Sequence, residues 1–169
     1  MPPKTTKSER KTPSQLADHT ARWAVTMAQV GIRQAIADSP WPHWNILKFT
    51  GPTGSEAKGV VDLIAVRKDH GEPFLPGTKR GETLQIILIQ AKGGSAAKPT
   101  EEDAIRLRGV ARHHGACDIL LSAWKKGRAA QFFSLRWDSE GHSDWHPVTA
   151  KDLKSVFGRR KVVIETDLG

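Results

Sequence analysis

The chain lacks several features that would narrow its interpretation at once. Its 169 residues include a single cysteine, Cys117, which excludes an intrachain disulfide and favours a reducing compartment. No segment approaches the roughly 18 apolar residues that a membrane span needs. The basic start, MPPKTTKSERKTPS, has no apolar region of the kind found in secretory signals. We therefore expect a protein of the cytoplasm, or of the nucleus in a eukaryote, without membrane association.

Common catalytic motifs are missing as well. There is no GxxxxGK[ST] phosphate loop and no GxSxG turn, and Cys117 opens an expected strand, which argues against a catalytic thiol. His142 and His146 have a spacing that suits a metal site on a helix, but GHSDWHP is typical of a loop. With no cysteine nearby, a zinc site is not expected there.

Tyrosine is absent, whereas there are six tryptophans. Trp23 falls on a helical apolar pattern and is expected in the core. Trp41, Trp44 and Trp145 lie in or beside expected loops, where they could either pack or stack on bases.

Positive charge is in excess. There are 26 Lys and Arg residues against 18 Asp and Glu, which gives a formal net charge of +8. This favours a polyanionic partner, with nucleic acid first and an anionic membrane second, although many basic proteins bind neither. Hydrophobic residues make up 38% of the chain, enough for the core of one domain.

Apolar periodicity predicts an α/β fold in which helices flank a mixed central sheet, in the order αβββαββ with a small helical extension. A helix should run from a cap at Ser14 to near Pro40, with Leu16, Trp23, Met27 and Val30 at helical spacing. Strands are expected at 44–50, 60–68, 84–92, 117–124 and 129–137, and further helices after Thr100 and Thr149. The third strand, the helix and the fourth strand should form a parallel crossover. Residues 1–12 should be a disordered basic arm, 13–137 the core, and 138–169 a C-terminal extension packed on it.

Polar residues interrupt two of the most apolar strands. Asp62 stands between Val61 and Leu63, and LQIILIQAK ends in Gln90 and Lys92, which share one face of their strand. If the two strands pair, a carboxylate, an amide oxygen and an ammonium group converge. Oxygen ligands of this kind suit Mg²⁺ or Mn²⁺, with the Ala91 carbonyl as a further ligand, while the lysine could orient water or neutralise a phosphate. The alternative is a strand acid that only pairs with Lys92 or Arg67.

These residues give the chain a likeness to a known family. VVDLIAV followed by IILIQAKGG resembles the PD-(D/E)XK nuclease superfamily, which has the restriction-endonuclease-like fold. The Gln form is similar to that of Mrr-like restriction endonucleases, and the rest of the core is similar to Holliday-junction-resolvase-like members. The resemblance implies Asp62 and Gln90 as metal ligands and Lys92 as the catalytic lysine. It also implies a further acid, for which Glu56 is the first candidate and Asp18 the second.

The expected function is therefore that of a metal-dependent DNA endonuclease, with RNA as another acceptable substrate. A surface of Arg108, Arg112, Lys125, Lys126 and Arg128 could follow the nucleic-acid backbone, or be only a solvated basic face. A homodimer would suit an enzyme that cuts two strands. Two alternatives stay open, because Gln90 replaces the usual glutamate: an inactive nuclease fold that only binds nucleic acid, and an accessory protein that binds another protein.

Overall fold

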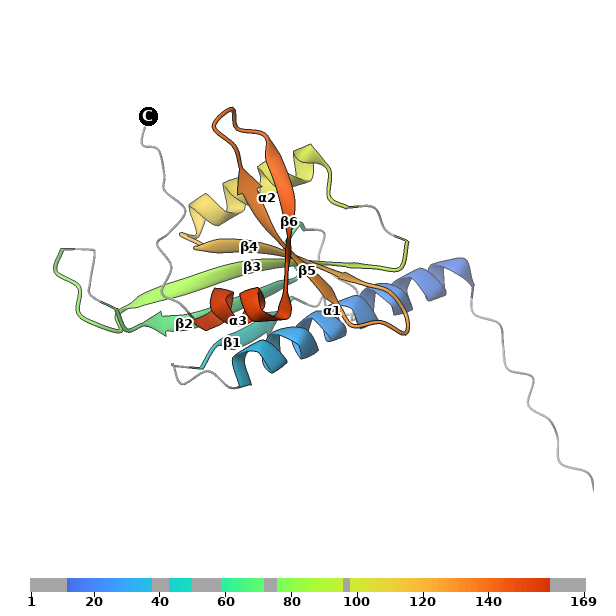
Figure 1. Cartoon of the computed structure of the whole chain (residues 1–169), viewed down its shortest axis with the longest axis horizontal. Helices are drawn as coiled ribbons and strands as arrows, with labels where there is room; N and C mark the ends of the chain where they lie inside the picture. The colour runs from blue at the N-terminus through green and yellow to red at the C-terminus, as the bar shows by residue number, and fades with distance from the viewer. Residues whose placement is uncertain (1–11, 38–42, 50–58, 72–75, 96–97, 159–169) are drawn as a thin grey trace, which may run out of the picture.

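A computed structural model describes residues 12–37, 43–49, 59–71, 76–95 and 98–158 (Figure 1). The predicted helices and strands are present, and one more strand lies between the last predicted strand and the last predicted helix. Their bounds are α1 Pro13–Ala37, β1 Asn45–Lys48, β2 Leu63–Asp69, β3 Thr83–Gly93, α2 Glu101–His113, β4 Asp118–Trp124, β5 Gln131–Trp137, β6 Ser143–Val148 and α3 Ala150–Gly158. Among these, no helix combines the length and apolarity that a bilayer crossing requires.

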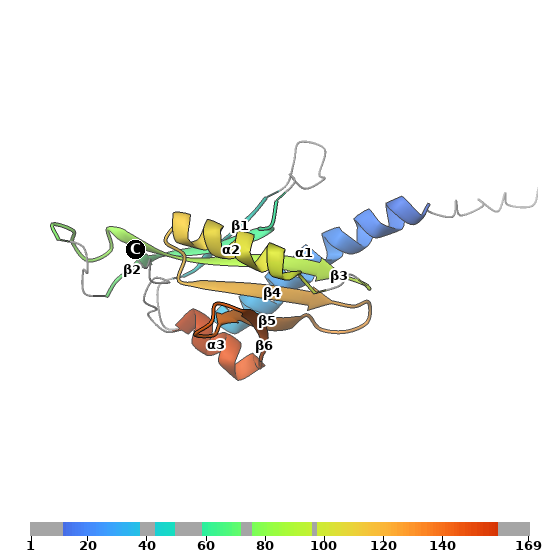
Figure 2. The same cartoon turned by 90° about the horizontal axis from the view of Figure 1, so that it is seen from above.

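The six strands that the structure describes form one mixed sheet in the order β1-β2-β3-β4-β5-β6. Neighbouring strands are antiparallel except for β3 and β4, which are parallel and joined through α2. The α/β class and the parallel crossover are thus confirmed. Two clusters of buried side chains lie on opposite faces of the sheet, one under α1 and α3 and the other under α2. Figure 2 shows α2 and α3 on opposite sides of the strands.

The helix α1 contacts the sheet through a different face from the one that its largest apolar residues indicate. Leu16, Trp23 and Val30 are exposed, so the expectation that Trp23 lies in the core is wrong. The buried residues of the helix are mostly small: Ala24, Val25, Ala28, Ile32 and Ala35. Small side chains allow the helix backbone to lie close to β3, so burial here depends on close approach rather than on side-chain size.

Gly93, the last residue of β3, is where this approach is closest. A Cβ atom at Gly93 would lie 2.9 Å from the Thr20 carbonyl oxygen and 3.0 Å from the Ala24 Cβ. We expect Gly93→Ala to lower the free energy of unfolding by about 1–3 kcal/mol, because helix backbone cannot move aside as a flexible side chain can. Urea unfolding should show this loss, whereas Gly109→Ala on α2, where the added Cβ meets nothing within 4 Å, should show none. Equal stability of the two variants would contradict the close packing of α1 on β3.

Side-chain caps fix the starts of the helices. Thr100 and Asp103 form the predicted capping box of α2, and the predicted cap of α3 is made by Thr149 with Asp152. The cap of α1 is Thr12 rather than Ser14: its hydroxyl accepts the Gln15 N–H, and the Gln15 side chain accepts the Thr12 N–H. Pro13 then occupies the first helical position, where its missing N–H has no cost.

Arg67 attaches α3 to the sheet. Its guanidinium group donates two hydrogen bonds to the Gln85 side-chain oxygen and one, 3.0 Å long, to the Phe157 carbonyl in the last turn of α3. It also lies 4.5 Å from the centre of the Trp44 ring, whose N–H donates to the same carbonyl. Burial lowers the pKa of Arg67, and the nearby Cys117 and Asp69 oppose that shift. Trp44 and Trp145 are both buried, so neither is available to stack on bases.

Candidate functional site

Asp62 lies just before β2, rather than inside the strand as expected. Its N–H donates to the Ile89 carbonyl over 3.0 Å, and its carbonyl accepts the Phe49 N–H over 3.2 Å. These bonds hold the Asp62 backbone between β3 on one side and the end of β1 on the other. The acid therefore stands at the end of the central strands, on a firmly bonded backbone.

The Asp62 side chain reaches β3 between the two other predicted site residues. Its Oδ2 atom accepts the Ala91 N–H over 2.5 Å, and the residue is only 8% exposed. A charged acceptor makes this bond stronger than one between neutral groups. Because the N–H and C=O of one residue point to the same edge of a strand, the Ala91 carbonyl faces the Asp62 side of β3.

Gln90 is buried on β3 with its amide oxygen unpaired. The residue is 4% exposed, and among the described residues nothing donates a hydrogen bond to Oε1. It follows Leu88 by two positions, so it lies on the same face as that member of the α2-side cluster. A buried polar atom without a partner costs about 1–3 kcal/mol, which a bound group could recover.

Lys92 is half-buried at the same end of β3. Within the described part of the chain, no ion pair joins it to Asp62. It lines a hollow of about 100 Å³ at the ends of β3 and β4, together with Trp124, Lys125 and Arg128. Arg67, the other cation considered as a partner for Asp62, bonds Gln85 and the Phe157 carbonyl. In the described ranges, the Lys92 ammonium group therefore has no carboxylate partner.

The further acid of the predicted site is not identified. Glu56 lies outside the described residues. Asp18 is exposed near the start of α1, and it makes no contact with Asp62, Gln90 or Lys92 in the ranges that the structure describes. The arrangement that the structure supports is therefore Asp62, Gln90 and Lys92 with the Ala91 backbone.

The predicted basic surface falls into two separate groups. Lys125, Lys126 and Arg128 are exposed in the turn between β4 and β5, next to the hollow that Lys92 lines. Arg108 and Arg112 are half-buried on α2, where the Arg108 guanidinium lies 4.9 Å from the centre of the Trp137 ring. Trp137 ends β5, so this arginine pair belongs to the other end of the hairpin. The β4–β5 turn is the basic group that adjoins the site.

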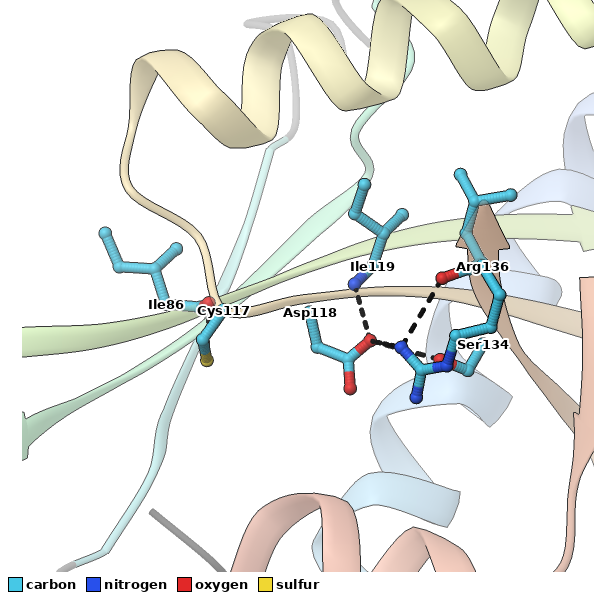
Figure 3. Close-up of polar contacts among 7 residues, drawn as sticks. Ile86, Cys117, Asp118, Ile119, Ser134 and Arg136 are labelled. Atoms are coloured by element: carbon cyan, nitrogen blue, oxygen red, sulfur yellow. Dashed lines mark hydrogen bonds and ion pairs between the residues drawn. The ribbon is translucent and has the colours of Figure 1, made fainter. Parts of the chain in front are cut away.

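A second buried carboxylate has a structural explanation. Asp118 begins β4, and its Oδ1 atom accepts hydrogen bonds from the Ile119 N–H and the Ser134 hydroxyl and lies 3.5 Å from Arg136 (Figure 3). Ser134 and Arg136 come from β5, so this carboxylate joins the two strands. Cys117 beside it donates its thiol to the Ile86 carbonyl.

Asp138, Glu140 and His142 form an exposed cluster in the turn between β5 and β6. The Asp138 carboxylate accepts the backbone N–H groups of His142 and Glu140. The bond from His142 is the largest cause of a lowered pKa for Asp138. These hydrogen bonds explain the closeness of the three side chains by the fold of the turn, without a bound ion.

Comparisons of the chain with protein-family models, with curated proteins and with solved structures find no match. The structure defines the fold class: this is an α/β protein whose mixed sheet is covered by helices on both faces. A function for this chain is therefore inferred from the geometry at the ends of β2 and β3.

Sequence reasoning missed Trp124 as a residue of this region. Trp124 pairs in register with Gly93, directly after Lys92, and its ring stacks on that of Trp23. The signal was present in the predicted parallel pairing of the two strands, because residues at their ends must then lie side by side.

Proposed function

We propose that this chain is a metal-dependent phosphodiesterase that cuts DNA, with RNA as the alternative polymer. The observation that carries the proposal is the buried amide oxygen of Gln90, which has no partner among the described residues and belongs to the residue next to Ala91, whose N–H binds the Asp62 carboxylate. The likeness of D…QxK to the PD-(D/E)XK nucleases supports the same function.

The donor atoms suit a hard divalent cation. Asp62, the Gln90 amide and the Ala91 carbonyl offer oxygen atoms only, as Mg²⁺ and Mn²⁺ prefer, and Glu56 would be the further ligand. A bound ion would supply Lewis-acid chemistry: it would activate water and neutralise charge on the phosphate. One carboxylate and one amide carry less charge than two carboxylates, so binding depends strongly on Asp62.

The chain itself contributes positioning and charge. The hydrogen bond from the Ala91 N–H fixes one carboxylate oxygen of Asp62, so the acid is held in place before any ligand arrives. Lys92 can donate hydrogen bonds to an attacking water or to a phosphate oxygen whose charge grows in the transition state. The exposed cations of the β4–β5 turn would hold adjoining phosphates. We place this activity in the cytoplasm, in keeping with the single cysteine.

Replacing Gln90 by Glu should increase the affinity for Mg²⁺ or Mn²⁺ on the order of tenfold or more. The substitution adds a formal negative charge at an atom that has no hydrogen-bond partner among the described residues. Titration calorimetry with Mn²⁺ measures this directly. Gln34→Glu adds the same charge on an exposed face of α1 and should leave the affinity unchanged. Equal affinities for wild type and Gln90→Glu would contradict a role for Gln90 as a ligand.

The rival function is nucleic-acid binding without cutting, which the Gln90 amide keeps open. Affinity does not separate the two, because both depend on phosphate contacts that salt weakens. Incubation of DNA with Mg²⁺ or Mn²⁺, against a chelator, does separate them. Cutting that requires the metal supports the phosphodiesterase, whereas binding without cutting supports the rival.

A further inference from the structure

Two tryptophan rings lie at the same end of the sheet as Lys92. Trp23 of α1 and Trp124 of β4 stack with their ring centres 6.3 Å apart and their planes at 23°. The Trp23 N–H donates to the His19 ring nitrogen over 3.1 Å. The ring is thus held from two sides, yet Trp23 is 45% exposed. A large apolar ring kept in one orientation at the surface is suited to contact another flat group.

The position of this pair relative to the candidate site follows from the backbone. Thr20 and Ala24 of α1 lie directly against Gly93, and the Gly94 N–H donates to the Trp124 carbonyl over 2.9 Å. Trp124 also lines the hollow of about 100 Å³ that Lys92 lines. The stacked rings therefore lie at the same end of the sheet as Lys92, but on the α1 face, whereas Gln90 and Lys92 are on the face that α2 covers. The two meet at the hollow at the ends of β3 and β4.

The hollow that Trp124 lines is bordered by positive charge. Lys92, Lys125 and Arg128 line the same hollow, and in the described ranges none of the three pairs with a carboxylate. An aromatic ring beside unpaired cations matches the chemistry of a nucleic-acid strand, whose bases stack on rings and whose phosphates bind cations. A neutral apolar partner would leave these charges without a counterpart.

We propose that Trp23, supported by Trp124, is a stacking platform for an unpaired base, with Lys125 and Arg128 binding the neighbouring phosphates. In a duplex the faces of the bases are covered by their neighbours, so only a single-stranded or locally opened segment can use the platform. The proposal rests on the proposed function and deepens it: the substrate class becomes single-stranded nucleic acid, or DNA that is unpaired next to the cut.

A rival explanation exists for the exposed ring. Leu16, Trp23 and Val30 are seven residues apart on the outward face of α1 and are all exposed, a pattern that a second copy of the chain could cover. The cations beside Trp124 favour nucleic acid over a second copy. The oligomeric state is therefore one of the outcomes to be measured.

The test is binding of a fluorescently labelled single-stranded 20-mer and of the matching duplex, by anisotropy, with a chelator and in about 0.15 M salt. Trp23→Ala should weaken single-strand binding about 5- to 150-fold, the range of single alanine substitutions at base-stacking residues, and leave duplex binding unchanged. Trp23→Phe, which keeps an aromatic face, should retain most of the affinity. Leu16→Ala, on the same exposed face but without a ring, is the matched control.

Three outcomes would overturn the proposal. The first is an unchanged single-strand affinity in Trp23→Ala, and the second is a loss of duplex affinity as large as the loss of single-strand affinity. The third is a dimer that dissociates in both Trp23→Ala and Leu16→Ala while single-strand affinity is kept. Circular dichroism and thermal unfolding confirm that each variant is folded. Because binding is measured without metal, it is independent of cutting. If the protein cuts DNA but Trp23→Ala leaves single-strand affinity unchanged, only the stacking proposal is wrong. If Trp23→Ala weakens single-strand binding but the protein never cuts, only the phosphodiesterase proposal is wrong.

Discussion

Asp62→Asn is expected to reduce metal-dependent cleavage on the order of 100-fold or more, with the fold intact. The asparagine is close in shape to the aspartate, and its side-chain oxygen can still accept the Ala91 N–H. What disappears is the negative charge, and with Gln90 neutral it is the only formal charge among the described donors of the site. The measurement is the initial rate of plasmid nicking at saturating Mg²⁺, with thermal unfolding recorded in parallel.

The control for this variant is Glu140→Gln, which removes one negative charge in the exposed β5–β6 turn. It should cut at the wild-type rate. If Asp62→Asn also cuts at that rate, the carboxylate is not part of the reaction, and the site at the end of β3 is wrong. A rate restored by a higher Mn²⁺ concentration would identify lost metal affinity as the cause.

Arg67→Ala should lower the free energy of unfolding by about 3 kcal/mol or more. The substitution leaves the buried Gln85 oxygen without its two donors and removes one of the two bonds to the Phe157 carbonyl. It also removes the cation from the face of the Trp44 ring. Urea unfolding followed by circular dichroism measures the loss.

Lys68→Ala is the matched control, because Lys68 is the next residue of β2 and is exposed. It should change the stability by no more than about 0.5 kcal/mol. Arg67→Lys should fall between the two, since it keeps the charge but cannot form the fork to Gln85. A loss below about 1 kcal/mol in Arg67→Ala would mean that α3 is held by its apolar residues alone.

The sheet was predictable because each strand carries its own signal. The alternation of LQIILIQAK and the cap at Thr100 are local, and β3, α2 and β4 in succession allow little besides a parallel crossover. Pairing of the strands at 60–68 and 84–92 predicted that Asp62 would approach Gln90 and Lys92. The approach is through the Ala91 backbone, which no side-chain pattern could indicate.

The outward face of α1 was misassigned because apolar periodicity gives most weight to large side chains. Leu16, Trp23 and Val30 have the strongest helical spacing, yet the helix packs through Ala24 and Ala28. Close approach to Gly93 is possible only on the small-residue face, and this depends on a partner 69 residues away in the chain. Which face of α1 packs on the sheet is therefore decided by tertiary contacts, and the local sequence of the helix does not show it.

The strand β6 was taken for a loop for a related reason. SDWHPV buries only Trp145 and contains Pro147, which usually argues against a strand. Among the described strands β6 is at the edge of the sheet, where a proline costs little because none of them pairs with the far side of β6. The exposure of Trp23 and the unpaired oxygen of Gln90 likewise depend on tertiary packing, and they carry the functional argument.

The central claim is that Asp62, Gln90 and Lys92 form a metal-dependent site for cutting phosphodiesters. The most direct test is cleavage of supercoiled plasmid and of labelled single strands with Mg²⁺ or Mn²⁺, against a chelator and against Lys92→Ala. The account predicts cutting that requires the metal and falls on the order of 100-fold or more in the variant. Cutting that survives Lys92→Ala, or DNA that is bound but never cut, would contradict it.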